Sequence, residues 1–247
     1  MEDEEIERYA RHLVLKEIGG PGQQRLKASH IVIIGAGGLG GPAALYLAAA
    51  GIGRITLIDP DVVSLDNLQR QIQFTTADIG QPKAAAAGDH LSNLNPHGKI
   101  ISVREAIDAE NAGHWLADAD IVLDGCDNFE TRFAVNAACH VLGKPLVSGA
   151  VGRWSGQVGL FASGTDRNQP CYQCFVPAMP PDAETCERVG VVGALTGIAG
   201  SMMALEAIKW ITGAGTPLTG RLWLYDGLAG TSRTLKITKD PACPVCG

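Results

Sequence analysis

The sequence has no excess of positive charge, no apolar leader segment and no long hydrophobic run that is free of charges. Its formal net charge is −6, which argues against the broad basic surface that binds nucleic acid. The most apolar stretch, residues 189–211, contains Glu206 and Lys209, and charges inside a membrane span are costly. We therefore expect a protein that binds no nucleic acid and does not cross a membrane.

The N-terminal segment MEDEEIERYARH is charged from its first residues, whereas a secretory leader needs an apolar stretch. We therefore expect a cytoplasmic protein. Hydrophobic residues make up 46% of the 247 residues and charged residues 19%, which is typical of a globular chain and excludes a disordered one. The seven cysteines favour metal binding or catalysis over disulfides in a cytoplasmic chain.

Apolar segments alternate with helical segments between residues 31 and 151, and this alternation predicts a parallel sheet covered on both faces. The predicted strands are residues 31–34, 54–59, 99–105, 120–125 and 145–151. The predicted helices between them are residues 42–50, 81–95, 109–117 and 128–143.

The two ends of the chain differ from this alternating core. Residues 2–26 predict a polar, amphipathic helical arm that is interrupted at the IGGPG of residues 18–22. Turn residues separate two antiparallel segments predicted at 155–163 and 221–238, with a helix at 192–212 between them.

These patterns predict one α/β domain over residues 1–247. Its fold class is a Rossmann-like, doubly wound and mostly parallel sheet with an antiparallel C-terminal extension. We divide it into a helical arm (1–28), a nucleotide-binding half (29–150) and a C-terminal half (151–247).

The segment IVIIGAGGLGG begins as an apolar strand and runs into a glycine-rich turn. Gly35, Gly37 and Gly40 match the G-x-G-x-x-G pattern, in which glycine permits a tight turn and brings backbone N–H groups close to a phosphate. Asp59 ends the next predicted strand, where an acid takes a ribose hydroxyl. The pattern predicts a nucleotide site, and a glycine turn used only for packing is the alternative.

The residues after Asp59 bear on which nucleotide binds. Arg70 and Lys83 are expected near the glycine turn, beyond the carboxyl end of the sheet. Two cations converging there favour a triphosphate over a dinucleotide, because they stabilise the charge of a departing phosphate. The alternative is that each cation is simply solvated. Asp127, directly after a buried strand, is placed to hold Mg²⁺, to cap the following helix, or to do both.

Two CxxC pairs, Cys171/Cys174 and Cys243/Cys246, lie far apart in the sequence. Four thiolates suit tetrahedral Zn²⁺, and four protein ligands make such a site structural because no position is open for chemistry. The alternative is a redox CxxC, but neither pair lies at the strand–helix junction of a thioredoxin-like site.

The other cysteines divide into two kinds. Cys126 and Cys139 lie in apolar contexts that predict buried packing. Cys186 lies in a proline-rich polar segment beside Arg188, before a predicted helix. It is predicted to be either a nucleophile activated by these neighbours or an ordinary exposed thiol.

Longer segments of the chain together resemble one family. They are RYARHLVLKEIGGPGQQRL, IIGAGGLGGPAALYLAAAGIG, LIDPDVVSLDNLQRQ, DIGQPK, DGCDN, CYQC, TCERVGVVG and CPVCG. In this order they resemble the MoeB/ThiF family, the bacterial relatives of ubiquitin-activating enzymes, over nearly the whole chain.

The resemblance implies an enzyme that binds ATP, Mg²⁺ and the C-terminal Gly-Gly tail of a small ubiquitin-like sulfur carrier. In the implied reaction the tail carboxylate attacks the α-phosphate, an acyl-adenylate forms and pyrophosphate leaves. A sulfur donor then converts the adenylate to a thiocarboxylate. Since no rhodanese segment follows residue 247, we expect the sulfur to come from a separate protein, a cysteine desulfurase or sulfurtransferase.

The motifs and the resemblance together imply roles for individual residues. The expected nucleotide-binding residues are Gly35, Gly37, Gly38, Gly40, Asp59, Asp66, Asn67, Gln69, Arg70, Lys83, Asp127 and Asn128. Arg70, Lys83 and Asp127 are also expected to be catalytic, with Asp127 holding Mg²⁺. The family often has Ser where this chain has Asp66, and an extra carboxylate there could alter phosphate affinity.

Other implied roles concern the second subunit and the cysteines. Arg11 resembles an arginine that reaches the ATP of the other subunit, which implies a homodimer with sites completed in trans. Cys186 matches a cysteine that some members use covalently with the carrier. The residues that match the structural zinc ligands are Cys171, Cys174, Cys243 and Cys246.

Adenylation of a sulfur carrier for molybdopterin biosynthesis is thus the leading hypothesis, and the thiazole (thiamine) carrier is the alternative substrate. Two hypotheses of other classes are an NAD-dependent oxidoreductase and a non-catalytic carrier-binding scaffold. Arg70, Lys83 and Asp127 argue against both.

Overall fold

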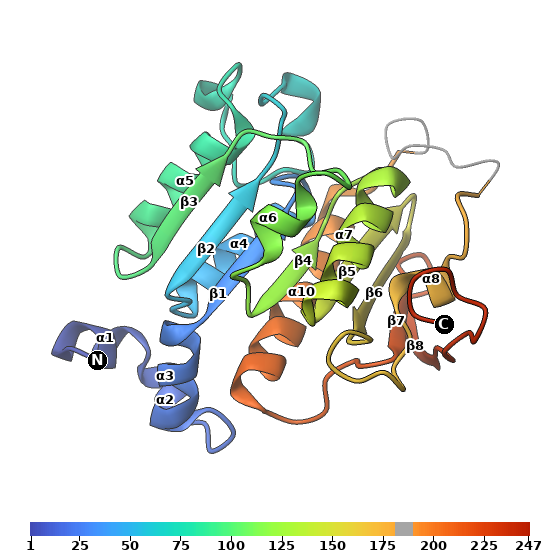
Figure 1. Ribbon diagram of the computed structural model, residues 1–247. Coiled ribbons are helices and arrows are strands. Elements are labelled where there is room, and N and C mark those ends of the chain that lie inside the picture. Colours follow the sequence, from blue (N-terminus) through green and yellow to red (C-terminus); the bar gives the residue numbers. More distant parts are fainter. Residues whose placement is uncertain (181–189) are drawn as a thin grey trace.

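Figure 1 shows the computed structural model, which describes residues 1–180 and 190–247. Its centre is an eight-stranded sheet with the order β3-β2-β1-β4-β5-β6-β7-β8. Strands β1 to β5 are parallel, and β6 to β8 continue the sheet in antiparallel fashion. The strands are β1 (His30–Ile34), β2 (Arg54–Ile58), β3 (Lys99–Val103), β4 (Ile121–Asp124), β5 (Leu146–Gly152), β6 (Ser155–Phe161), β7 (Arg221–Asp226) and β8 (Thr231–Lys236). The predicted Rossmann-like sheet with an antiparallel extension is confirmed.

The central strands are buried on both faces, as apolar runs of this kind require. Every residue of β1 and of β4 is buried. Ile34, the last residue of β1, pairs with Ile58 on one side and with Asp124 on the other. The loops that follow these three strands therefore begin at the same edge of the sheet.

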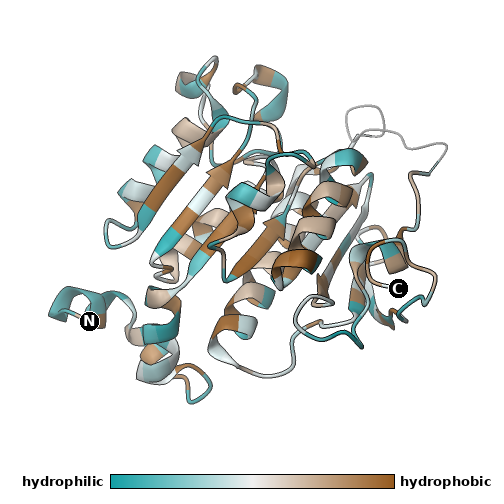
Figure 2. Ribbon diagram, viewed as in Figure 1, coloured by the Kyte–Doolittle hydropathy of each residue, from teal (hydrophilic) through white to brown (hydrophobic). Residues whose placement is uncertain are grey.

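Helices cover both faces of the sheet. In Figure 1, α6 (Ala112–Leu116) and α7 (Phe129–Leu142) lie in front of the sheet, and α4 (Gly40–Ala49) and α10 (Gly193–Thr212) lie behind it. α5 (Lys83–Leu94) shares a hydrophobic cluster with α4 and α10, and a second cluster includes α6 and α7. Figure 2 shows the strongest hydrophobic colour in the central strands, which places the core between the two helical layers.

The N-terminal arm differs from the prediction. It consists of α1 (Asp3–Arg8), α2 (Ala10–Leu13) and α3 (Gly19–Ala28). The predicted interruption at residues 18–22 is wrong, because α3 begins there. Pro21 lies in the first turn of α3, where its missing N–H breaks no helical hydrogen bond. The arm instead breaks between α2 and α3.

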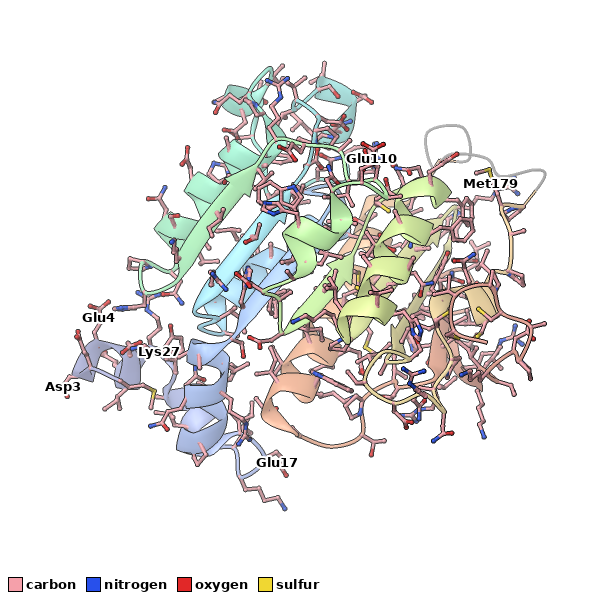
Figure 3. All side chains as sticks on the ribbon, in the orientation of Figure 1. Asp3, Glu4, Glu17, Lys27, Glu110 and Met179 are labelled. Atoms are coloured by element: carbon pink, nitrogen blue, oxygen red, sulfur yellow. The ribbon has the colours of Figure 1, made fainter. Side chains whose placement is uncertain are left out.

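One polar contact joins α1 to α3 within the arm, and another joins the arm to the rest of the domain. Lys27 Nζ donates to Glu5 Oε2 at 2.7 Å, and Glu5 is buried. Asn95 Nδ2 donates to the Tyr9 hydroxyl at 2.8 Å. Figure 3 labels Lys27 next to α1, with Asp3 and Glu4 on the outer side of that helix. The charged lead-in is therefore an ordered part of the domain.

Helix α6 is shorter than predicted. Asp108 Oδ1 accepts hydrogen bonds from the backbone N–H groups of Glu110 and Asn111, at 2.8 and 3.1 Å. This local turn competes with helix formation, and α6 begins only at Ala112. Short elements that the sequence did not predict are η1 (Leu65–Asn67), η2 (Thr76–Asp78) and α8 (Tyr172–Phe175).

The C-terminal strand and tail have different surroundings. β8 forms one edge of the sheet, and all six of its residues are exposed. After β8 the chain returns to α8 and brings Cys243 and Cys246 against Cys171 and Cys174.

None of the helices that the structure describes is both long and apolar enough to cross a lipid bilayer.

Candidate functional site

The glycine turn follows β1 and leads into α4. Gly35 has a φ of +89°, a left-handed conformation that glycine adopts without strain. A Cβ atom at Gly40 would lie 1.8 Å from the Gly35 carbonyl oxygen, so only glycine permits this close approach of helix and strand. The turn therefore needs glycine at both positions for its own geometry.

Asp59 holds the turn from the end of β2. Its Oδ2 accepts a hydrogen bond from the Ala36 N–H at 2.7 Å, and its Oδ1 accepts one from the Asp61 N–H at 2.9 Å. Burial raises the pKa of the Asp59 carboxyl, and the nearby Lys83 cation opposes that rise. The carboxylate is thus fixed next to the turn, where a ribose hydroxyl can reach it.

A cavity of about 370 Å³ opens at this edge of the sheet, within the range of small-molecule sites. It collects most of the residues that the sequence predicted for the nucleotide. Those lining it are Gly35, Gly37, Gly38, Asp59, Arg70, Lys83, Asp127 and Asn128.

The two predicted cations reach the cavity from different elements. Lys83 is the first residue of α5, is buried, and donates through Nζ to Asp61 Oδ2 at 2.9 Å. Arg70 follows η1, and its Nη1 donates to the Asp66 carbonyl oxygen at 3.0 Å. The converging cations are therefore present, and each is held by an oxygen of the chain.

Asp127 presents its carboxylate to the cavity. It is exposed, lines the cavity, and makes no hydrogen bond or ion pair with the residues that the structure describes. The N-cap of α7 is Asn128, whose side chain accepts the Thr131 N–H at 2.9 Å. Asp127 is therefore not the capping residue. A hard oxygen ligand facing a cavity fits Mg²⁺.

Four of the predicted nucleotide-binding residues do not line this cavity. Gly40 packs against Gly35. Asn67 is buried, with its Nδ2 3.3 Å from Asp66 Oδ2. Asp66 is exposed and accepts a hydrogen bond from the Ser64 hydroxyl, which lowers the pKa of the Asp66 carboxyl. Gln69 is also exposed.

Arg11 lies far from the cavity of its own chain. It is an exposed residue of α2, and Figure 1 places α2 beyond the amino ends of the strands, whereas the cavity is at their carboxyl ends. Any contact between Arg11 and this kind of site therefore has to involve another copy of the chain.

Helix N-termini surround the cavity. Four residues at or next to the first turn of a helix line the cavity. They are Leu39 before α4, Lys83 in α5, Phe129 in α7 and Thr196 in α10. Helix N-termini carry partial positive charge and unpaired N–H groups. Together with Lys83 and Arg70 they make this cavity suited to a polyanion.

The predicted metal ligands come together beside α7, where Asn136 Nδ2 donates to Cys171 Sγ at 3.6 Å. The Sγ atoms of Cys171, Cys174, Cys243 and Cys246 all lie within 4.8 Å of one another. The Sγ–Sγ distance is 3.5 Å for Cys171 and Cys243 and 3.4 Å for Cys174 and Cys246. Tetrahedral zinc with Zn–S bonds of about 2.3 Å needs sulfurs about 3.8 Å apart, so the cluster fits zinc after a small expansion.

The remaining cysteines differ in their surroundings. Cys139 is buried, as predicted. The predicted burial of Cys126 is wrong for the whole residue, because it lines the cavity and is half-buried; its Sγ donates to Asp124 Oδ1 at 2.8 Å. Burial and the Asp124 charge raise the pKa of the Cys126 thiol. Cys186 lies outside the residues that the structure describes.

Two residues near the cavity were missed by sequence reasoning. Asp61 holds Lys83, and its position two residues after Asp59 was the only available signal. Arg132 forms a buried ion pair with Asp124 at 2.9 Å. Its place on an apolar helix face, where an unpaired charge is costly, could have indicated a partner.

Comparisons with known proteins agree with this geometry. The chain is 41% identical to the molybdopterin-synthase adenylyltransferase of Escherichia coli, covering 100% of this chain and 98% of that protein. It is 42% identical to the sulfur carrier protein ThiS adenylyltransferase of the same organism, covering 100% of this chain and 97% of that protein.

The fold is also found in a crystal structure of E. coli MccB with ATP. The TM-score is 0.84 and the identity 25%, over 97% of this chain and 74% of that one. The sequence model of the ThiF family matches residues 9–245. The chain therefore belongs to the ThiF family.

Proposed function

We propose that this protein is an adenylyltransferase that uses ATP to activate the C-terminal glycine of a small sulfur carrier protein. The observation that carries the proposal is the cavity beside the glycine turn, where Arg70, Lys83 and the free carboxylate of Asp127 converge. The similarity to the two E. coli adenylyltransferases and to MccB, whose crystal structure was solved with ATP, supports it.

The cavity residues suit the chemistry of this reaction. A carrier carboxylate oxygen bonds to the α-phosphorus, the bond from that phosphorus to the bridging oxygen breaks, and pyrophosphate leaves with the electron pair. Lys83 and Arg70 are placed to neutralise the charge of the phosphate chain. Asp127 would hold Mg²⁺, which would supply further charge stabilisation at the phosphates.

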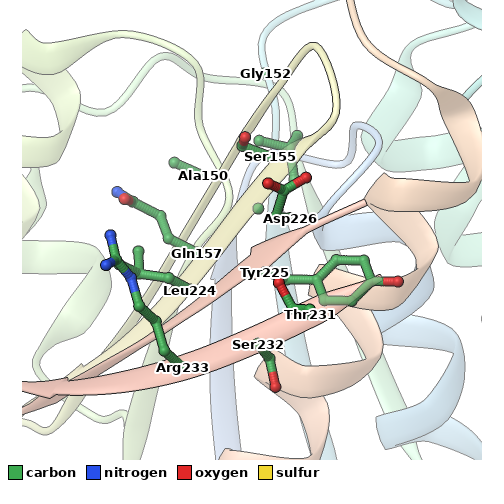
Figure 4. A pocket seen from close by; sticks show the side chains of 12 residues that line it. Ala150, Gly152, Ser155, Gln157, Leu224, Tyr225, Asp226, Thr231, Ser232 and Arg233 are labelled. Carbon is green, nitrogen blue, oxygen red and sulfur yellow. The ribbon is translucent and has the colours of Figure 1, made fainter. Parts of the chain in front are cut away.

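We propose that the carrier binds to the C-terminal half of the domain. A second hollow in this half could hold the carrier. This hollow of about 740 Å³ lies on the antiparallel part of the sheet. Figure 4 shows Gln157, Leu224 and Arg233 projecting toward it from adjacent strands. Ala150 and Val151 line both this hollow and the nucleotide cavity. A carrier on this surface could therefore pass its tail to the phosphates.

We also propose a homodimer in which Arg11 completes the site of the other subunit. α4 and α10 share an apolar groove of about 790 Å³, whose lining includes Leu45, Tyr46, Ile198, Met202 and Leu205. Large exposed apolar patches mark interaction surfaces. α10 borders both this groove, through Ile198, and the nucleotide cavity, through Thr196. A second copy bound in the groove would lie next to the nucleotide.

The cysteine cluster is proposed to bind structural zinc, which would fasten the C-terminal tail to α8. We retain the division into an arm (1–28), a nucleotide-binding half (29–150) and a carrier-binding half (151–247). A separate sulfur donor and a cytoplasmic location remain predictions from the sequence.

The other functions are less well supported. An NAD-dependent oxidoreductase has no evident need for Arg70 and Lys83 beside the turn, and a non-catalytic scaffold has no evident need for a free carboxylate at Asp127. Molybdopterin biosynthesis remains the favoured pathway, although identities of 41% and 42% to the two E. coli relatives do not separate it from the thiazole pathway.

Exchange of labelled pyrophosphate into ATP tests the proposal directly. We expect exchange only when a carrier with a Gly-Gly terminus is present. Molybdopterin-type and thiazole-type carriers assayed side by side would identify the pathway. Absence of exchange with both carriers, in a protein that binds ATP, would favour the scaffold.

A further inference from the structure

One buried arginine in the lining of the nucleotide cavity connects three elements. Arg132, in the first turn of α7, is 5% exposed. Its Nη1 donates to Asp124 Oδ2 at 2.9 Å and to the Ser148 hydroxyl at 2.8 Å. Its Nη2 donates to the carbonyl oxygen of Cys126 and, at 2.8 Å, to that of Gly149. The guanidinium therefore joins the end of β4, the loop after it, and β5.

The partners of Arg132 are also bonded to one another. Asp124 is buried, and its Oδ2 accepts the Ser148 hydroxyl at 2.8 Å. Its Oδ1 accepts the Cys126 N–H at 3.1 Å. A buried ion pair of this kind is weak evidence for stability, because removing both charges from water costs about as much as their attraction returns. The geometric effect of the ion pair and its hydrogen bonds is to hold the Arg132 guanidinium in a single orientation.

The first consequence concerns Asp127. On one side of it, Arg132 holds the carbonyl of Cys126. On the other side, the Asn128 side chain is fixed to the Thr131 N–H. The backbone is therefore restrained on both sides of Asp127, while its carboxylate lines the cavity without a partner among the described residues. A ligand group with such support is preorganised for binding.

The second consequence concerns β5. Arg132 holds the carbonyl of Gly149, and the next residues, Ala150 and Val151, line both the nucleotide cavity and the hollow on the sheet face. The same guanidinium thus sets the spacing between the Asp127 loop and the place where the two hollows meet.

We propose that Arg132 is a positioning residue for adenylation. It holds Asp127 and the end of β5 in one arrangement, so that the phosphate chain and the attacking carboxylate meet at the correct distance. Errors of about 1 Å in such an arrangement can cost about 100-fold in rate. This inference rests on the proposed function.

Arg132→Lys tests the inference, because lysine keeps the charge but lacks the planar fork that binds carbonyls and carboxylate together. We expect carrier-dependent pyrophosphate exchange to fall about 100-fold and the affinity of the ATP complex for Mn²⁺, measured by electron paramagnetic resonance, to fall about tenfold. ATP affinity without metal should change by less than about twofold, since Asp59, Lys83 and the turn are untouched.

A matched control is Glu206→Gln. Glu206 is a fully buried carboxylate of α10 that pairs with Lys209 at 2.6 Å, and it lines none of the cavities described. We expect this variant to lose thermal stability with no change in Mn²⁺ affinity. If Arg132→Lys has the same pattern, Arg132 is merely structural and the proposal is overturned.

Ser148→Ala provides a second test if Arg132→Lys folds poorly. It removes one hydroxyl from the same cluster, and we expect a smaller loss of Mn²⁺ affinity in the same direction. Unchanged Mn²⁺ affinity would overturn the proposal. Absence of exchange in the unmodified protein with every carrier would instead refute the proposed function, and the Mn²⁺ measurements would still decide the role of Arg132.

Discussion

Lys83 Nζ lies 2.9 Å from Asp61 Oδ2, and the two partners differ in their exposure. The Lys83 side chain is 9% exposed and the Asp61 side chain 64% exposed. A buried cation of the nucleotide cavity is thus held from its solvent side by a carboxylate. A phosphate chain entering the cavity has to displace that carboxylate or share Lys83 with it.

Replacing the competing carboxylate should strengthen ATP binding. We expect Asp61→Asn to bind metal-free ATP about fivefold more tightly, because a removed surface anion is worth about 1 kcal/mol at most. Isothermal titration without metal measures this, with Lys83→Met as the opposite control that weakens binding. Weaker binding by Asp61→Asn would mean that the carboxylate supports the bound state.

Removing the free carboxylate of the cavity should stop the chemistry. We expect Asp127→Ala to lower pyrophosphate exchange by about 100-fold or more, while sedimentation shows the same oligomeric state as the parent protein. Glu130→Ala is the matched control, because Glu130 is an exposed carboxylate three residues away that does not line the cavity. Normal turnover by Asp127→Ala would exclude the proposed mechanism.

Sites completed in trans predict complementation between two inactive variants. A mixed dimer of Arg11→Ala and Asp127→Ala subunits has one site with both residues intact. Random mixing should therefore restore about a quarter of the normal activity. Pyrophosphate exchange after co-refolding measures this, and separately assayed variants are the control. If mixtures that contain mixed dimers recover no activity, Arg11 does not complete the site of the other subunit.

The cysteine cluster should bind zinc and stabilise the fold without joining the reaction. We expect Cys171→Ser to lose bound zinc and to unfold at a lower temperature. Cys139→Ala, which removes a buried thiol outside the cluster, should keep its zinc. Elemental analysis and thermal unfolding measure both effects. Full zinc content in Cys171→Ser would refute the ligand assignment.

The contact between α1 and α3 within the N-terminal arm should depend on pH. The hydrogen bond from Lys27 holds the pKa of Glu5 below its ordinary value of 4.5. The stabilisation by this pair is therefore complete above that value, and it is lost as the pH falls through the lower pKa of the folded state. Hydrogen exchange in α1 should accelerate over that acidic range in the native protein.

In Glu5→Gln the acceleration with falling pH should disappear, because no charge remains to be neutralised at this position. Exchange in β5, which lies two strands away from β1 in the sheet order, provides the internal reference. An identical pH profile of α1 in the two proteins would show that the pair does not hold α1 against α3.

Features that rest on local pattern were predictable from the sequence. β1 and β4 are buried apolar runs, which are recognisable in the sequence. The glycine turn is recognisable too, because the backbone geometry of the turn requires glycine at Gly35 and Gly40. The two CxxC pairs were predictable in the same way, because two cysteines separated by two residues are a typical spacing of zinc ligands.

Features that depend on topology were not predictable. Lys83 and Asp61 are 22 residues apart, and Arg132 and Ser148 are 16 apart, so their contacts exist only after the strands and helices are assembled. The IGGPG sequence predicts the break in the arm at residues 18–22, because glycine and proline are typical of turns. Pro21 suits a first helical turn equally well, and α3 begins there.

The exposed edge strand has a consequence for how copies of this chain meet. On its outer side β8 pairs with no other strand that the structure describes, and such an edge in an apolar strand favours edge-to-edge pairing between molecules. Its sequence, TSRTLK, contains Arg233 and Lys236 and a single large apolar residue. Like charges on two such edges repel, so β8 disfavours open-ended growth of the sheet, and association is directed instead to the helical face of the molecule.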